Sequence, residues 1–113
     1  MKALEAAERN IAMNHAKQAG LALMIYAADY DDMLPGAGDI TDQVLPYVKN
    51  RDILDGFVYT FGGGSMTDID NPAKTEIGYR MGPNGRAVVY ADGHVQWIPN
   101  PAPVASLMLK RLG

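Results

Sequence analysis

The run of residues 86–98, Arg-Ala-Val-Val-Tyr-Ala-Asp-Gly-His-Val-Gln-Trp-Ile, constrains the fold more than any other part of the chain. Two stretches rich in β-branched and aromatic residues, 87–91 and 94–98, flank the dipeptide Asp92-Gly93. Both central residues of a type I′ turn need a positive φ, which Asp-Gly tolerates, so the run predicts a β-hairpin with a tight two-residue turn. Such a turn would oppose Ala91 to His94, Tyr90 to Val95, Val89 to Gln96 and Val88 to Trp97.

One face of this hairpin is expected to be apolar. Residues two apart along a strand point to the same side, and directly opposed residues share a side as well. The other face would carry His94. Because a tight turn already requires Asp-Gly, we interpret Asp92-Gly93-His94 as turn chemistry and not as a reactive site. Four large apolar side chains would then face a core together. These predicted core residues are Val88, Tyr90, Val95 and Trp97.

Residues 2–30 are predicted to form one long helix, because Ala, Leu, Met, Glu, Lys and Gln dominate and proline is absent. The segment 19–28 is apolar almost all round, whereas 2–18 is small and polar. A helix half with so little apolar surface gains little from tertiary packing, so we expect a partner to cover it. The apolar stripe predicted from the helical spacing consists of Ala12, Ala16, Ala19, Leu23, Tyr26 and Tyr30.

Shorter patterns follow the long helix. Thr41 is a candidate N-cap for a short helix over 42–49, which Pro46 would shorten or kink. The sequence Gly82-Pro-Asn-Gly85 predicts a turn between two strands. Further strands are expected over 56–61 and 75–81, and a short helix over 103–112, where Val104, Leu107, Met108 and Leu112 have helical spacing.

These elements predict a single α+β domain over residues 1–113. An isolated meander of strands needs a cover on its apolar face, and the apolar second half of the long helix can provide it. We therefore expect a long N-terminal helix packed on a three- to four-stranded antiparallel meander within 56–98, followed by a short C-terminal helix.

Composition excludes several classes of function. A length of 113 residues suits one domain with a modest core. The net charge of -3 and scattered basic residues argue against a surface for nucleic acid or anionic membrane. The absence of cysteine excludes disulfides and thiolate chemistry. No run approaches the roughly 18–20 apolar residues of a membrane span, and no signal peptide is visible, so either the protein is cytosolic or a targeting segment precedes this sequence.

Two blocks of sequence resemble a known family. Residues 14–32 read Asn-His-Ala-Lys-Gln-Ala-Gly-Leu-Ala-Leu-Met-Ile-Tyr-Ala-Ala-Asp-Tyr-Asp-Asp and precede Leu34-Pro35, and residues 85–98 end in Ala-Asp-Gly-His-Val-Gln-Trp-Ile. Leu-Pro-Tyr-Val-Lys-Asn at 45–50 fits between them. In this order the blocks resemble the soluble part of type IV pilin-like proteins, specifically the major-pseudopilin-like proteins of type II secretion systems.

The resemblance implies a structural role without catalysis, so an enzyme is not expected. In the family, N-terminal helices pack as the core of a filament and the sheet domains coat its outside. The implied partners are further copies, other pilin-like subunits and inner-membrane components of the secretion system. The implied location is the periplasmic or extracellular side, with an inner-membrane anchor before assembly.

The chain departs from the family pattern at three places. The Gly/Phe-Thr-Leu-Ile-Glu cleavage motif and its apolar helix are missing, so we expect them upstream of Met1 in the native product. The cysteines that many relatives carry are missing as well. One related group has a histidine ten positions before the Asp-Gly, where this chain has Gly82.

Acidic residues at the predicted helix exit are the best candidates for a metal site. Hard oxygen ligands on a flexible loop suit Ca²⁺, although the spacing of Asp29, Asp31 and Asp32 does not fit an EF-hand. The loop containing Asp68 and Asp70 is a second, poorer candidate. A minor filament-tip or surface module that binds a ligand or calcium is therefore the alternative function, and no other cofactor is expected.

Other candidate sites favour structural interpretations. His15 and His94 are isolated, whereas zinc needs three or four ligands. The sequence Gly62-Gly-Gly-Ser lacks the lysine of a phosphate-binding loop and is expected to be a flexible connection.

Overall fold

The computed structural model describes residues 2–101, so the predicted helix over 103–112 lies outside the described residues. Two α-helices and six strands are connected by four short 3₁₀ helices. The helices and strands are α1 (Lys2–Asp29), β1 (Met33–Leu34), α2 (Thr41–Val44), β2 (Phe57–Tyr59), β3 (Gly64–Ser65), β4 (Glu76–Gly82), β5 (Gly85–Tyr90) and β6 (Val95–Pro99). The 3₁₀ helices are η1 (Leu45–Tyr47), η2 (Arg51–Ile53), η3 (Met66–Asp68) and η4 (Pro72–Lys74).

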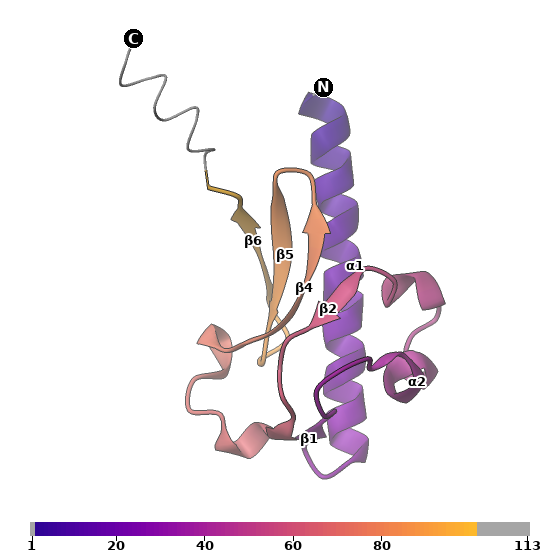
Figure 1. The fold of residues 1–113 in the computed structure, drawn as a ribbon, viewed down its shortest axis with the longest axis vertical. Coiled ribbons are helices and arrows are strands. Elements are labelled where there is room, and N and C mark those ends of the chain that lie inside the picture. The colour runs from indigo at the N-terminus through magenta and orange to yellow at the C-terminus, as the bar shows by residue number, and fades with distance from the viewer. Residues whose placement is uncertain (1, 102–113) are drawn as a thin grey trace.

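The strands form one antiparallel sheet of four in the order β2-β4-β5-β6 and a separate antiparallel pair, β1-β3. Helix α1 runs along one face of the larger sheet and extends beyond the tip of the β4–β5 hairpin at its N-terminal end (Figure 1). The prediction of an α+β domain with a long helix on an antiparallel sheet is therefore confirmed for the described residues.

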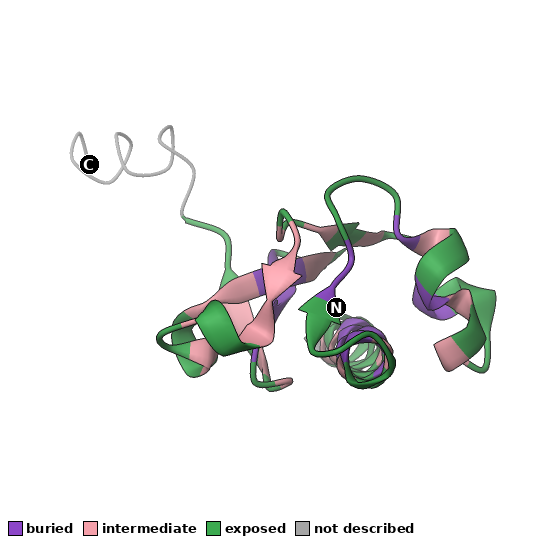
Figure 2. Ribbon diagram, turned by 90° about the horizontal axis from the view of Figure 1, so that it is seen from below, coloured by how far each residue is buried: buried purple, intermediate pink, exposed green. Residues whose placement is uncertain are grey.

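Small side chains bring α1 close to the sheet. Ala16 and Ala19 are fully buried on α1, and Ile77 and Val89 are fully buried on the strands opposite. Gly20 lies where a Cβ atom would be only 2.7 Å from Cγ1 of Val89, so a side chain at this position would force Val89 or the helix to shift. In Figure 2, buried stretches of the ribbon (purple) lie on the long helix and on the part of the sheet next to it.

The hairpin between β5 and β6 has a three-residue connection, so the predicted two-residue type I′ turn is wrong. Gly93 has φ 90° but Asp92 has no positive φ. The N–H of Gly93 donates to Tyr90 O at 2.8 Å, and the N–H of Tyr90 donates to His94 O at 3.0 Å. These bonds and angles fit a type I turn followed by a glycine bulge, which an Ala-Asp-Gly sequence also suits.

The longer turn shifts the register by one residue and reverses the faces of one strand relative to the other. Val95 lies opposite Val89, and Trp97 lies opposite Ala87. Val95 and Trp97 pack against the helix-facing core, whereas Val88 lies opposite Gln96 on the other face. The predicted single face is therefore corrected: the structure splits Val88 and Tyr90 from Val95 and Trp97.

The segment between α1 and the sheet is folded in short turns. Helix α2 is confirmed but begins at Thr41, with Ile40 and not Thr41 at the N-cap position. Asp39 Oδ1 accepts from both the N–H and the hydroxyl of Thr41, at 2.9 and 2.6 Å. Pro46 lies in the first turn of η1, because proline lacks the N–H that a continuing α-helix would need.

The turn between β4 and β5 is confirmed. Gly82 pairs with Gly85, so Pro83 and Asn84 form the two-residue connection. Asn84 has φ 61°, and proline ahead of a residue with positive φ is typical of a type II turn.

Candidate functional site

The part of α1 that the sheet does not bury carries exposed apolar side chains. At 3.6 residues per turn they fall within roughly a 100° arc. Four large members of this arc are 42–59% exposed: Leu4 (55%), Ile11 (56%), Leu21 (59%) and Ile25 (42%). We call these four residues, together with the exposed Ala3, Ala7, Asn14 and Gln18 between them, the outer stripe.

The outer stripe bears no charge over more than five helical turns. Its two polar members satisfy each other, since the side-chain amide of Gln18 donates to Asn14 Oδ1 at 2.8 Å. The charged residues Glu5, Arg9 and Lys17 project from other sides of the helix, by their spacing. A long, uncharged and partly apolar helix face is suited to packing against another helix.

The N-terminal part of α1 has few contacts to hold it. Within the described residues, the Arg9 guanidinium lies 6.0 Å from the centroid of the Trp97 ring. Residues 3–11 are exposed except for the half-buried Ala6. This part of the helix agrees with the expectation that 2–18 is thinly apolar.

At the other end of α1, tyrosines anchor the chain that leaves the helix. The rings of Tyr26 and Tyr30 stack at 4.3 Å, and Tyr47 meets Tyr26 edge-on at 6.1 Å. The Tyr47 hydroxyl donates to Asp29 Oδ2 at 2.7 Å, and this hydrogen bond raises the pKa of Tyr47 to about 12. Tyr59 donates to the carbonyl oxygen of Pro35 at 2.6 Å, and its burial raises its pKa.

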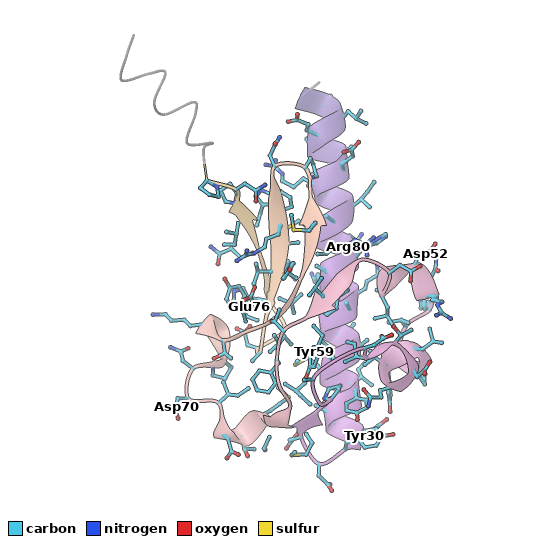
Figure 3. All side chains as sticks on the ribbon, in the orientation of Figure 1. Tyr30, Asp52, Tyr59, Asp70, Glu76 and Arg80 are labelled. Atoms are coloured by element: carbon cyan, nitrogen blue, oxygen red, sulfur yellow. The ribbon has the colours of Figure 1, made fainter. Side chains whose placement is uncertain are left out.

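The candidate calcium ligands are not gathered into a site. Asp29 accepts from Tyr47, while Asp31 and Asp32 are exposed in left-handed conformations, with φ 55° and 63°. Asp70 lies on the opposite side of the molecule from Tyr30, the neighbour of Asp31 (Figure 3). Within residues 2–101, no three His, Asp or Glu side chains are placed to hold a metal ion together.

The Asp92-Gly93-His94 segment forms a local hydrogen-bonded unit. Asp92 Oδ1 lies 2.5 Å from His94 Nδ1 and accepts the His94 N–H at 3.1 Å. These hydrogen bonds hold the pKa of Asp92 below its usual value of 3.8, and the bond to the His94 side chain contributes most to this lowering. The imidazole also stacks on the ring of Tyr90, with the ring centroids 4.4 Å apart, so these contacts of His94 support the turn.

One structural role was missed by the sequence patterns. Arg80 lies on the helix-facing side of β4, where its guanidinium donates to the carbonyl oxygens of Asp52 at 3.3 Å and of Ile53 at 3.4 Å, and also to that of Asp55. Figure 3 shows Arg80 beside the turn that contains Asp52. An arginine in a strand gives no sequence signal for contacts with a loop about 25 residues earlier. The outer stripe was missed as well, although its spacing could have been read from the sequence.

Comparison of the chain with protein-family models, with curated proteins and with solved structures finds no match. Among the described helices, none combines the length and the apolar character needed to cross a membrane.

Proposed function

We propose that the chain is the sheet-bearing domain of a filament subunit of the type IV pilin or type II secretion pseudopilin kind, and that it assembles through its N-terminal helix. The observation that carries the proposal is the outer stripe: a long uncharged helix face, exposed along its length, on a helix whose other side is buried by a sheet. A helix of this kind can pack against equivalent helices of other subunits.

Two further observations support the proposal. The sequence block at 14–32 forms the part of α1 that packs on the sheet and its exit, and the block at 85–98 forms the β5–β6 hairpin beside it. The two stretches that resemble the family therefore lie at one interface, between helix and sheet. In this proposal the native product also has an apolar segment upstream, an inner-membrane anchor before assembly and a sheet domain on the periplasmic or extracellular side.

The first test is the native gene product itself. We expect the coding region upstream of Lys2 to encode a Thr-Leu-Ile-Glu motif and an apolar helix, and the intact mass of the mature protein to show leader cleavage. A native start at Met1 with no upstream segment would contradict the filament proposal, because the helix would lack its membrane anchor.

The second test concerns the outer stripe directly. The double variant Leu4→Asp with Ile11→Asp, introduced into the native product, should abolish filaments seen by electron microscopy while leaving the circular dichroism of the isolated domain unchanged. The matched control is Met33→Asp, since Met33 is also exposed and apolar but lies off the helix. Filaments that form as well with the double variant as with the control would exclude the outer stripe as the assembly surface.

A further inference from the structure

We propose that the free edge of β6, together with the side of α1 next to it, binds an extended acidic segment of a partner protein as a further strand. We call this surface the β6 groove, and its residues are Arg9, Met13, Lys17, Val95 and Trp97. The β6 groove shares no residue with the outer stripe, so this inference goes beyond the proposed filament function and does not rest on it.

The outer edge of β6 has unpaired backbone groups. β6 is the last strand of the four-stranded sheet, so no described strand lies on its other side (Figure 1). The carbonyl oxygen of His94 accepts from β5 at 3.0 Å, and the N–H of Asn100 donates to the β4–β5 turn at 2.9 Å. Because backbone groups alternate in direction along a strand, Val95 and Trp97 direct their N–H and C=O groups away from β5. Pro99 has no N–H, so the edge open to a further strand covers 95–97.

One side of α1 forms the wall of the groove beside this edge. Met13, Lys17 and Val95 line a hollow of about 600 Å³. Arg9 and Trp97 line the adjoining hollow of about 350 Å³ toward the N-terminal end of the helix. The Arg9 guanidinium lies 6.0 Å from the centroid of the Trp97 ring, so its charge lies beside the edge of the sheet.

The charge of the β6 groove is positive at two points. Neither Arg9 nor Lys17 forms an ion pair with another described residue. Acidic residues lie toward the ends of the groove: Glu5 also lines the smaller hollow, and the Asp92 carboxylate is bound to the His94 ring. Two cations without a counter-ion therefore flank a centre made of Met13, Val95 and Trp97, and this charge pattern is complementary to carboxylates on a partner.

The spacing of the two cations matches the repeat of an extended strand. Arg9 and Lys17 are eight positions apart, about 12 Å along the helix axis. Residues four apart on a strand point to the same side and lie about 13–14 Å from each other. Val95 and Trp97 pack against the helix-facing core, so residues of an added strand that lie opposite them also point toward α1.

These dimensions define the partner as an extended segment with the pattern acidic–x–apolar–x–acidic. Its two carboxylates would meet Arg9 and Lys17, and the apolar residue between them would lie on Met13. Its backbone would pair with Val95 and Trp97, as in other complexes formed by strand addition. A helix could not replace it, because the backbone groups of a helix are already paired with one another. A basic segment would be repelled by both cations.

Peptide binding followed by NMR tests the inference on the 113-residue chain. The probe is the heptapeptide Thr-Asp-Thr-Leu-Thr-Asp-Thr, blocked at both ends, and its matched control has asparagine at both aspartate positions. We expect saturable shifts centred on the backbone amides of Val95 and Trp97. Two exposed ion pairs should make the Kd of the aspartate peptide at least about fivefold lower than that of the asparagine peptide.

Charge reversal provides the second arm of the experiment. The double variant Arg9→Glu with Lys17→Glu should lose the preference for aspartate and should favour a peptide with lysine at both positions. The control Lys49→Glu with Lys74→Glu changes the net charge equally at exposed residues that line neither hollow, and it should keep the parent's preference.

Three outcomes would overturn the inference. The first is that the aspartate peptide produces no shifts at Val95 and Trp97, and the second is that the two peptides bind with equal affinity. The third is that these amides shift with protein concentration in the absence of peptide, because a second copy would then occupy the edge. The comparison of the two peptides uses the unaltered protein, so it decides the question even if charge reversal changes the circular dichroism. None of these outcomes depends on filament assembly.

Discussion

Gly20 of α1 and Val89 of β5 approach so closely that a Cβ atom on Gly20 would lie 2.7 Å from Cγ1 of Val89. The carbonyl oxygen of Gly93, in the turn that follows β5, would lie 3.8 Å from the same Cβ. The missing side chain at position 20 therefore determines how closely the long helix can approach the centre of the sheet and its last turn. Substitutions here report directly on that distance.

Gly20→Ala should destabilise the domain. The overlap with Val89 costs about 1–3 kcal/mol, as for other overpacked cores, and the better helix propensity of alanine recovers about 1 kcal/mol of it. Thermal or urea unfolding measures the difference. Combining Gly20→Ala with Val89→Ala should cost less than the sum of the single variants, since the clash is removed in the pair. Additive effects would mean that the two residues do not touch.

Gly93→Ala should also destabilise the domain, because the backbone conformation at this position disfavours any residue with a side chain. Gly93 has φ 90°, while a Cβ atom there would meet only Met24 Cγ at an ordinary 3.7 Å. The cost is the strain of a positive φ, about 1–2 kcal/mol. The control is Gly36→Ala, where a Cβ atom would meet nothing within 4 Å. Equal unfolding midpoints for the two variants would contradict the bulged turn.

Trp97→Ala tests which face of β6 is covered. The indole of Trp97 lies over Gly82 and Gly85, where a Cβ atom at either position would be 2.7 Å from it. Because neither glycine has a side chain, removing the indole would leave the space above them empty. Because the indole is partly exposed, we expect a loss of about 2–3 kcal/mol, below the range of about 3–5 kcal/mol for buried tryptophan. Gln96→Ala, on the face of the sheet that points away from α1, should change the free energy of unfolding by less than about 0.5 kcal/mol. If Gln96→Ala cost more free energy of unfolding than Trp97→Ala, the result would support the register of the two-residue turn instead.

The hydrogen bonds of Asp92 predict an acid dependence of stability. Because folding lowers the pKa of Asp92, its contribution is present above the ordinary value of 3.8 and is lost as the pH falls through the lowered value. The parent should therefore have a higher melting temperature than Asp92→Asn near neutral pH, and the gap should close in strong acid. A gap for Asp92→Asn that is independent of pH would refute the role of this carboxylate.

Much of the fold could be predicted, since its signals lie in short stretches of sequence. The helix over 2–30 follows from propensity and the absence of proline, and it ends at Asp29. The strands expected at 75–81 and 87–91 are β4 and β5, displaced by one or two residues. The buried Ala16, Ala19 and Leu23 follow from periodicity alone.

The candidate site was harder to predict. Asp29, Asp31 and Asp32 are neighbours in sequence, but the turn that ends α1 and the bond to Tyr47 direct them apart. Arg80 contacts a loop about 25 residues away, and no local pattern reports such a contact. Calcium binding and filament assembly stay predictions.

The hairpin at 86–98 shows most clearly which features are determined by neighbouring residues and which are determined by packing in the folded protein. Alternation of side chains and the Asp92-Gly93 dipeptide were sufficient to identify two strands and a tight turn, because strand propensity and positive φ are properties of a few adjacent residues. The sequence was not sufficient to determine the register of the two strands, because Ala-Asp-Gly suits a three-residue turn as well as Asp-Gly suits a two-residue turn. Packing decided between them: the three-residue turn places Val95 and Trp97 beside Ala87 and Val89 against α1, and a register shift of one residue would turn them to the other face.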